Sequence, residues 1–242
     1  TNYLYLRMNT KIWKFNYTNL FAEMNAENDS GSDKVLEKKY LALHHLSLNI
    51  LKNLNVGIWE ATTFGRNRRY FDLQYLNPII FYRSVEQQIG SGDNALLGLD
   101  MHYNFLKHFQ FYSQITLDEF FLSHIKAQDK WWANKQAFQV GGKYVDVGGI
   151  SNLDLQGEIN YIRPYVYSHK NNYTSYTHYT QPLAHPLGSN LREAIGIIRY
   201  QPLPRLNIIA KIINADVGID FDSVSYGSNP AISSGSRGVC PS

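Results

Sequence analysis

The stretch 97–118, LGLDMHYNFLKHFQFYSQITLD, decides the fold class of this chain. Apolar residues occupy every second position up to Phe105, and the alternation resumes at Phe109 after a three-residue break at 106–108 (LKH). A β-strand places alternate residues on opposite faces, so each half of the stretch has an apolar and a polar face. We therefore predict an antiparallel hairpin with a very short turn.

The same pattern occurs five times, and a long polar or aromatic connection separates each hairpin from the next. The predicted turns are Thr10-Lys11, Leu51-Lys52-Asn53, Leu106-Lys107-His108, Gly148-Gly149-Ile150-Ser151 and Pro202-Leu203-Pro204. Alternation of tight turns and long loops is typical of outer-membrane β-barrels, in which the turns lie at one rim and the loops at the other. Each strand also has about the 9–11 residues that a tilted strand needs to cross a bilayer.

A soluble β-barrel or sandwich shows the same alternation, with its apolar face in the core. Two features favour a membrane barrel, in which the apolar face points outward. Aromatic residues such as Tyr103, Phe105 and Phe109 gather next to the turns, where an interfacial girdle lies in a membrane barrel. The strands are also longer than the usual five or six residues or so. We predict an all-β, transmembrane antiparallel barrel whose lipid-facing residues include Leu99, Met101, Phe111, Ile115, Leu155 and Ile208.

The predicted strands divide the chain into two parts. Residues 1–222 form an outer-membrane β-barrel segment of five hairpins, about ten strands, and 223–242 form a Ser/Gly-rich mobile end. Because Asn2 to Asn9 already alternate as a strand and no export signal precedes them, we expect a fragment of a larger barrel. A short helix is predicted for 77–90 in a long connection, either as a plug inside the barrel or as a surface helix.

Composition narrows the classes of function. The net charge of +3 is too small to indicate nucleic-acid binding, and the only cysteine, Cys240, permits neither a disulfide framework nor a thiolate metal site. The histidines lack metal-ligand spacing, and Asp118 and Glu119 face opposite sides of a strand, so they do not form a catalytic carboxylate pair. We expect no metal, no cofactor and no enzymatic activity.

Binding residues are expected in the long connections and on the polar face of the strands. Trp131 and Trp132 can stack on sugar rings or anchor the protein at the membrane interface. The connection 164–190 is dense in Tyr, His and Asn and resembles a carbohydrate or protein recognition loop. The predicted ligand-binding residues, for a glycan or a polar network in the lumen, are Arg83, Glu86, Asp100, Asp118, Trp131, Trp132, Asn134, Arg163, Tyr165, His178 and His185.

Several strings carry a family resemblance: NPIIFYRSVE (77–86), GDNALLGLD (92–100), LDEF (117–120), WWANK (131–135), NLDLQ (152–156), RPY (163–165) and HYTQPLAHPLG (178–188). They resemble the capsule-assembly Wzi-like outer-membrane barrels of Bacteroidetes-type bacteria, and gliding-motility-associated proteins of those bacteria look similar. The resemblance covers roughly Tyr70 to Tyr200. It implies a large barrel with a polar lumen, occluded by helices or loops, without bond-breaking chemistry; this chain lacks the later strands of such a barrel.

The leading hypothesis is a non-enzymatic barrel in the outer membrane of a Gram-negative bacterium that takes part in binding, attachment or assembly of surface polysaccharide. Its expected partners are outer-membrane lipid, surface polysaccharide and other outer-membrane or surface-machinery proteins, not nucleic acid. One alternative is a structural subunit of a gliding-motility or secretion complex. The others are a soluble β-barrel or sandwich binding protein and a membrane-embedded hydrolase.

Overall fold

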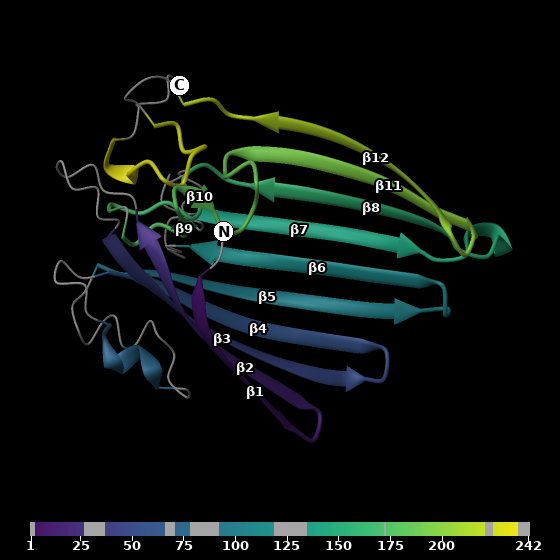
Figure 1. The fold of residues 1–242 in the computed structure, drawn as a ribbon, viewed down its shortest axis with the longest axis horizontal. Coiled ribbons are helices and arrows are strands. Elements are labelled where there is room, and N and C mark those ends of the chain that lie inside the picture. The colour runs from purple at the N-terminus through teal and green to yellow at the C-terminus, as the bar shows by residue number, and fades with distance from the viewer. Residues whose placement is uncertain are drawn as a thin grey trace, which may run out of the picture.

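A computed structural model defines an all-β fold (Figure 1). It describes residues 3–26, 37–65, 71–77, 92–118, 135–171, 173–220 and 225–236. The strands of the main sheet are β1 (Leu4–Ile12), β2 (Phe15–Ala26), β3 (Glu37–Leu51), β4 (Leu54–Phe64), β5 (Asn94–Phe105), β6 (Phe109–Asp118), β7 (Lys135–Tyr144), β8 (Leu153–Ile162), β11 (Leu191–Leu203) and β12 (Leu206–Val217). The described part of the chain holds no helix of the length and hydrophobicity that a membrane crossing requires.

All ten strands are antiparallel and lie side by side in chain order, β1-β2-β3-β4-β5-β6-β7-β8-β11-β12. β9 (Thr177–His178) and β10 (Gln181–Pro182) pair only with each other and belong to the connection between β8 and β11. Within the described residues β1 and β12 are the two edges of the sheet. Figure 1 shows the tight turns at the right and the long connections, together with both termini, at the left.

The five predicted hairpins are present, and two of their turns are displaced. Thr10 and Lys11 continue β1, paired with Tyr17 and Asn16, and the turn falls at 13–14. The prediction was wrong because it placed the turn at the polar residues, whereas Trp13 (φ 53°) adopts the left-handed conformation. The last turn lies at 204–205 instead of 202–204, since Leu203 still pairs with Leu206.

The remaining turns follow the prediction closely. The β3–β4 turn lies at 52–53, and the β5–β6 turn occupies 106–108 as predicted. The predicted turn 148–151 lies inside a longer connection, 145–152, which contains the 3-10 helix η2 (Val147–Gly149). Gly149, at φ 83°, takes a conformation that favours glycine.

The predicted apolar residues share one face, which we call the outer face. Leu99 pairs with Ile115, Tyr103 with Phe111, and Leu155 with Ile198, so apolar side chains face one another across β5–β6 and across β8–β11. Many of these side chains are exposed: Leu99 is 50% and Ile159 is 63% accessible. An extended exposed apolar surface marks a site of contact with membrane or protein. The shared face is confirmed, and its contact with lipid stays a prediction.

Aromatic rings form a row on the outer face beside the tight turns of β5 to β7. The ring centroids of Tyr103 and Phe105 lie 5.5 Å apart, those of Phe105 and Phe109 5.2 Å, and those of Phe109 and Tyr144 4.4 Å. All three pairs are stacked. The row therefore lies where the sequence analysis expected an aromatic girdle.

The connection between β8 and β11 packs against part of the inner face of the sheet. We call this segment, residues 163–171 and 173–190, the strap. Its Val166 and Tyr167 are buried in one apolar cluster with inner-face residues from six strands, namely Ala22, Met24, Leu41, Ala61, Leu96, Ala137 and Ile162, and with Leu191 at the start of β11. Because a short segment reaches residues from β2 to β11, the sheet must curl around it.

A second apolar cluster lies on the outer face, near the long connections of β2 to β4. Tyr75, from the 3-10 helix η1 (Leu73–Leu76), is fully buried there, and its ring stacks on Phe64 with centroids 4.3 Å apart. The Tyr75 hydroxyl donates a 2.7 Å hydrogen bond to Asp93. The segment 71–77 therefore packs against this part of the outer face. Of the predicted helix 77–90, only Asn77 lies within the described residues.

Candidate functional site

Two buried lysines fasten the strap to the sheet. Lys39 on β3 donates from Nζ to the Ser175 carbonyl (2.9 Å) and to the Thr177 hydroxyl (2.8 Å). Lys135 on β7 donates in the same way to the Ser168 carbonyl at 2.9 Å. Both lysines are completely buried, and a buried amino group is tolerated only when it is hydrogen-bonded. The two side chains therefore hold the strap at the long-connection ends of β3 and β7.

Two further strands hold the strap through its backbone and a histidine. The Asp118 carboxylate on β6 accepts a 2.7 Å hydrogen bond from the Tyr167 amide. On β2, the Asn25 amide donates to His178 Nδ1 at 3.1 Å, and the Tyr179 amide donates to the Asn25 carbonyl at the same distance. Together with β3 and β7, four strands are thus bonded to the strap by these groups. The strap is thus a built part of the fold, although its sequence shows no periodicity.

Burial also shifts the titration of two strap tyrosines to higher pH. It raises the pKa of Tyr176 to about 12 and raises the pKa of Tyr167 as well. Both rings therefore remain neutral at physiological pH and act as apolar packing groups with a polar hydroxyl.

The described part of the predicted mobile end, 225–236, lies against the strap. The Tyr165 hydroxyl donates to the Ser225 carbonyl (2.8 Å), and the Tyr165 amide donates to the Gly227 carbonyl (3.0 Å). The Ser189 hydroxyl donates to the same Gly227 carbonyl at 2.8 Å. Gly227 has a φ of 83°, and a Cβ there would lie 2.4 Å from the Tyr165 nitrogen, so only glycine permits this approach.

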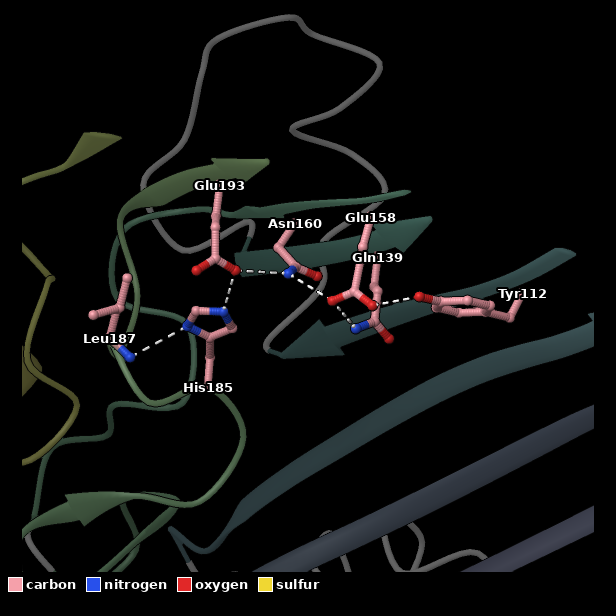
Figure 2. A network of polar contacts seen from close by, with 7 residues as sticks. All are labelled: Tyr112, Gln139, Glu158, Asn160, His185, Leu187 and Glu193. Atoms are coloured by element: carbon pink, nitrogen blue, oxygen red, sulfur yellow. Dashed lines mark hydrogen bonds and ion pairs between the residues drawn. The ribbon is translucent and has the colours of Figure 1, made fainter. Parts of the chain in front are cut away.

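Beneath the strap, polar side chains from four strands form a continuous network (Figure 2). The Tyr112 hydroxyl donates to Glu158 at 2.5 Å, and the Gln139 and Asn160 amides each donate to Glu158 at 3.0 Å. The Asn160 amide also donates to Glu193 at 2.9 Å. Because Gln139, Asn160 and Glu193 are direct cross-strand neighbours, the sheet register itself assembles this part of the network.

His185 joins the strap to this network. Its Nδ1 accepts a hydrogen bond from the Leu187 amide (3.3 Å), and its Nε2 lies 3.0 Å from the Glu193 carboxylate. A ring nitrogen that accepts a hydrogen bond carries no proton, so Nε2 bears the proton and donates to Glu193. The tautomer is thereby fixed by the geometry on both sides of the ring.

Glycines on intervening strands let inner-face side chains meet across them. Tyr112 on β6 reaches over Gly141 of β7 to Glu158 on β8, and a Cβ on Gly141 would lie 2.3 Å from the Tyr112 ring. In the same way His45 on β3 and Asp100 on β5 meet above Gly57 of β4, with 2.8 Å between Nε2 and Oδ2. A Cβ on Gly57 would lie 2.5 Å from both of these side chains.

A cavity of about 170 Å³ lies between the network and the strap. Its polar lining consists of Gln114, Thr116, Gln139, Asn160 and His185, and its apolar lining includes Trp59, Leu96, Ala137, Ile162, Tyr167, Tyr176 and Ala184. Aromatic rings beside convergent polar groups are the usual composition of a small-molecule site. Within the described residues, no group of three His, Cys, Asp or Glu side chains is arranged to hold a metal ion.

The structure brings some of the predicted site residues together. His185 lies at the cavity, while Asp118, Tyr165 and His178 anchor or bury the strap at the end of the sheet opposite the tight turns. Asp100 lies apart, paired with His45. Arg163 begins the strap, and its amide donates to the Gln136 carbonyl at 3.1 Å. Arg83, Glu86, Trp131, Trp132 and Asn134 lie outside the described residues.

Sequence reasoning missed the centre of the network. Tyr112, Gln139, Glu158, Asn160 and Glu193 all occupy polar positions of strands that the alternation had identified. The signal was the run of polar residues on one face of β8, Asp154, Gln156, Glu158 and Asn160, in which acids alternate with amides. Alternation alone assigns these residues to the polar face and does not indicate which partners they bind.

Comparisons with known proteins add no identification. Protein-family models, curated proteins and solved structures were all searched, and none matches this chain. The resemblance to the Wzi-like barrels therefore stays a prediction.

Proposed function

We propose that this chain is the wall of a non-enzymatic outer-membrane β-barrel that binds surface polysaccharide, or assists its attachment, on its inner side. The observation that carries the proposal is the inverted burial of the sheet. Its outer face exposes large apolar side chains on interior strands, such as Leu99 (50%), Ile159 (63%) and Ile198 (47%). A soluble barrel buries this face, whereas a membrane barrel presents it to lipid.

The inner face supports the second half of the proposal. It carries the network of amides, carboxylates and a phenol, and the strap lies over it like the loops that narrow the lumen of many barrels. Side chains that stack and donate or accept hydrogen bonds suit a hydroxyl-rich ligand such as a glycan. We assign these groups to binding.

Purification from the outer membrane of the source cells in mild detergent tests the proposal. We expect the protein in the outer-membrane fraction and polysaccharide in the mass spectra of the purified material. Cells lacking the protein should retain less polysaccharide at their surface than cells in which it is restored. Protein in the soluble fraction would overturn the membrane assignment, and unchanged polysaccharide retention would overturn the binding role.

The exposed edges of the sheet favour one alternative, a structural subunit of a surface complex. Every residue of β1 and of β12 is exposed, and the outward backbone groups of an edge strand can pair with a strand of another chain. In the same purification this function predicts a protein partner in stoichiometric amount and no bound polysaccharide.

A further inference from the structure

The cavity under the strap carries an uneven distribution of hydrogen-bonding groups. The Gln139 and Asn160 amides turn their nitrogen atoms toward Glu158, because only the NH₂ group can donate to a carboxylate. Figure 2 shows the Gln139 oxygen turned away from Glu158. The amide oxygens of both residues accept no hydrogen bond from the described residues. They are therefore acceptors that a ligand can use.

Two carboxylates stand behind these amides. The partners of Glu158 and Glu193 are amide, phenol and imidazole groups, and within the described residues neither carboxylate forms an ion pair with lysine or arginine. Both carboxylates lie behind the residues that line the cavity, and Arg199 joins the opposite end of the network through Gln156. The side of the network next to the cavity is therefore negative and rich in acceptors. A bound group must donate hydrogen bonds, and a negative charge close to these carboxylates is repelled.

A free amide and three rings complete the cavity. Gln114 lines it from β6 and forms no hydrogen bond with any described residue, so its amide can both donate and accept. Trp59, Tyr167 and Tyr176 supply aromatic surface. Such rings stack on the C–H faces of sugars while the polar groups bind their hydroxyls.

From this chemistry we propose that the cavity is a subsite for a single neutral or amino-bearing sugar unit and that it discriminates against acidic sugars. The proposal rests on the proposed function, whose glycan it assigns to a chemical class. Hydroxyls of the sugar donate to the Gln139 and Asn160 oxygens, Gln114 bonds a further hydroxyl, and an ammonium substituent gains from Glu158 and Glu193. A uronic acid brings its carboxylate into the same negative field.

Binding of three defined trisaccharides to the full chain in detergent micelles tests this assignment. The probes are maltotriose, which is neutral, chitosan trimer, which carries amines, and trigalacturonate, which carries carboxylates. We expect maltotriose and chitosan trimer to bind at least about tenfold more tightly than trigalacturonate in isothermal titration calorimetry. Equal affinity for all three, or tighter binding of trigalacturonate, would overturn the proposal.

Two glutamines on one strand provide the matched variants. Gln114→Ala removes the free amide and should weaken maltotriose binding roughly 2- to 10-fold, which corresponds to one hydrogen bond. Gln110 lies on the same face of β6 near the tight turn, outside the cavity lining, so Gln110→Ala should leave the affinity unchanged. Equal effects of the two substitutions would place the sugar elsewhere.

The charge preference has its own variant. Because an ammonium substituent gains from the two carboxylates, chitosan trimer should bind more tightly than maltotriose. Glu193→Gln keeps the side-chain length and removes one negative charge, so it should reduce this difference while the affinity for maltotriose changes little. An unchanged preference would exclude the carboxylate from recognition. Heat-modifiable migration in gels verifies that each variant folds before binding is measured.

The outcomes separate the subsite from the proposed function. If none of the trisaccharides binds while cells still depend on the protein for polysaccharide retention, the subsite is refuted and the function stands. If the trisaccharides bind with the expected order but the cells retain their polysaccharide without the protein, the subsite stands and the function is refuted.

Discussion

Arginine at Leu99 gives a direct test of whether the outer face contacts lipid. Leu99 lies at the centre of β5 (Asn94–Phe105), and its side chain is 50% exposed. Phe105, on the same face, is six residues away, which corresponds to roughly 14 Å along the membrane normal for a strand that rises about 3.3 Å per residue at about 45° tilt. That distance is about half the hydrocarbon thickness, so Phe105 lies near an interface if Leu99 lies at the midplane.

The two environments predict different costs. In a bilayer, Leu99→Arg should lower the free energy of unfolding by about 2–4 kcal/mol, and Phe105→Arg by about 0–1 kcal/mol, because the cost of an arginine falls toward the interface. In a soluble protein, arginine at a half-exposed surface position changes the stability by no more than about 0.5 kcal/mol. The loss in free energy of unfolding caused by Leu99→Arg therefore distinguishes a membrane barrel from a soluble protein.

Guanidinium unfolding of the protein in lipid vesicles, followed by tryptophan fluorescence, measures these free energies. His102→Arg is the matched control, because His102 is exposed on the inner face of the same strand. This substitution should lower the free energy of unfolding by less than about 0.5 kcal/mol. Equal stability of the Leu99→Arg and His102→Arg proteins in vesicles would refute the assignment of the outer face to lipid.

Three other perturbations probe the inner face. Gly141→Ala places a Cβ 2.3 Å from the Tyr112 ring, so it should lower the free energy of unfolding in urea by about 1–3 kcal/mol. Gly142→Ala, whose nearest neighbour is 3.5 Å away, should lower it less, and similar losses for the two variants would contradict the crossing of Tyr112 over β7. Lys135→Met removes the donor to the Ser168 carbonyl, so limited proteolysis should cut the strap faster than in wild type, while Lys143→Met should not change the rate. Burial raises the pKa of Tyr167 and Tyr176, the latter to about 12, so the packing of the strap should be complete below pH ~10 and weaken as the pH rises above it. Ultraviolet difference spectra measure this titration, and titration of all tyrosines together near pH ~10 would show that the two rings are not buried.

The sheet could be predicted because its signal is local and repeated. Alternation with a period of two is specific to strands, and the run from Leu97 to Leu117 carries it with few interruptions. The displaced turn of the first hairpin shows the limit of this reading. Thr10 and Lys11 are polar enough for a turn, but the pairing of Ile12 with Phe15 keeps two apolar side chains on the outer face, and this tertiary requirement fixes the turn at 13–14.

The strap and the polar network could not be predicted in the same way. Lys39 and Ser175 lie 136 residues apart, and Tyr112 and Glu158 lie 46 apart, so no window of sequence contains either pair. The partners meet only after the sheet has formed. The composition of this connection, rich in Tyr and His, led us to predict a recognition loop, and it did not indicate that the segment packs against the inner face.

The two open edges of the sheet limit how the sheet can lie in a membrane. Lipid offers no hydrogen-bond partners, so an open strand edge cannot lie in the hydrocarbon of a bilayer. β1 and β12 run antiparallel, and each presents apolar residues on the outer face, for example Leu6 and Ile212. β12 is also apolar on its inner face, where Ile209 and Ile213 are 65% and 50% exposed. If the outer face contacts lipid, both edges must therefore pair with strands, either with each other or with strands outside this sheet, and the inner face of β12 must meet apolar groups that the strap does not supply.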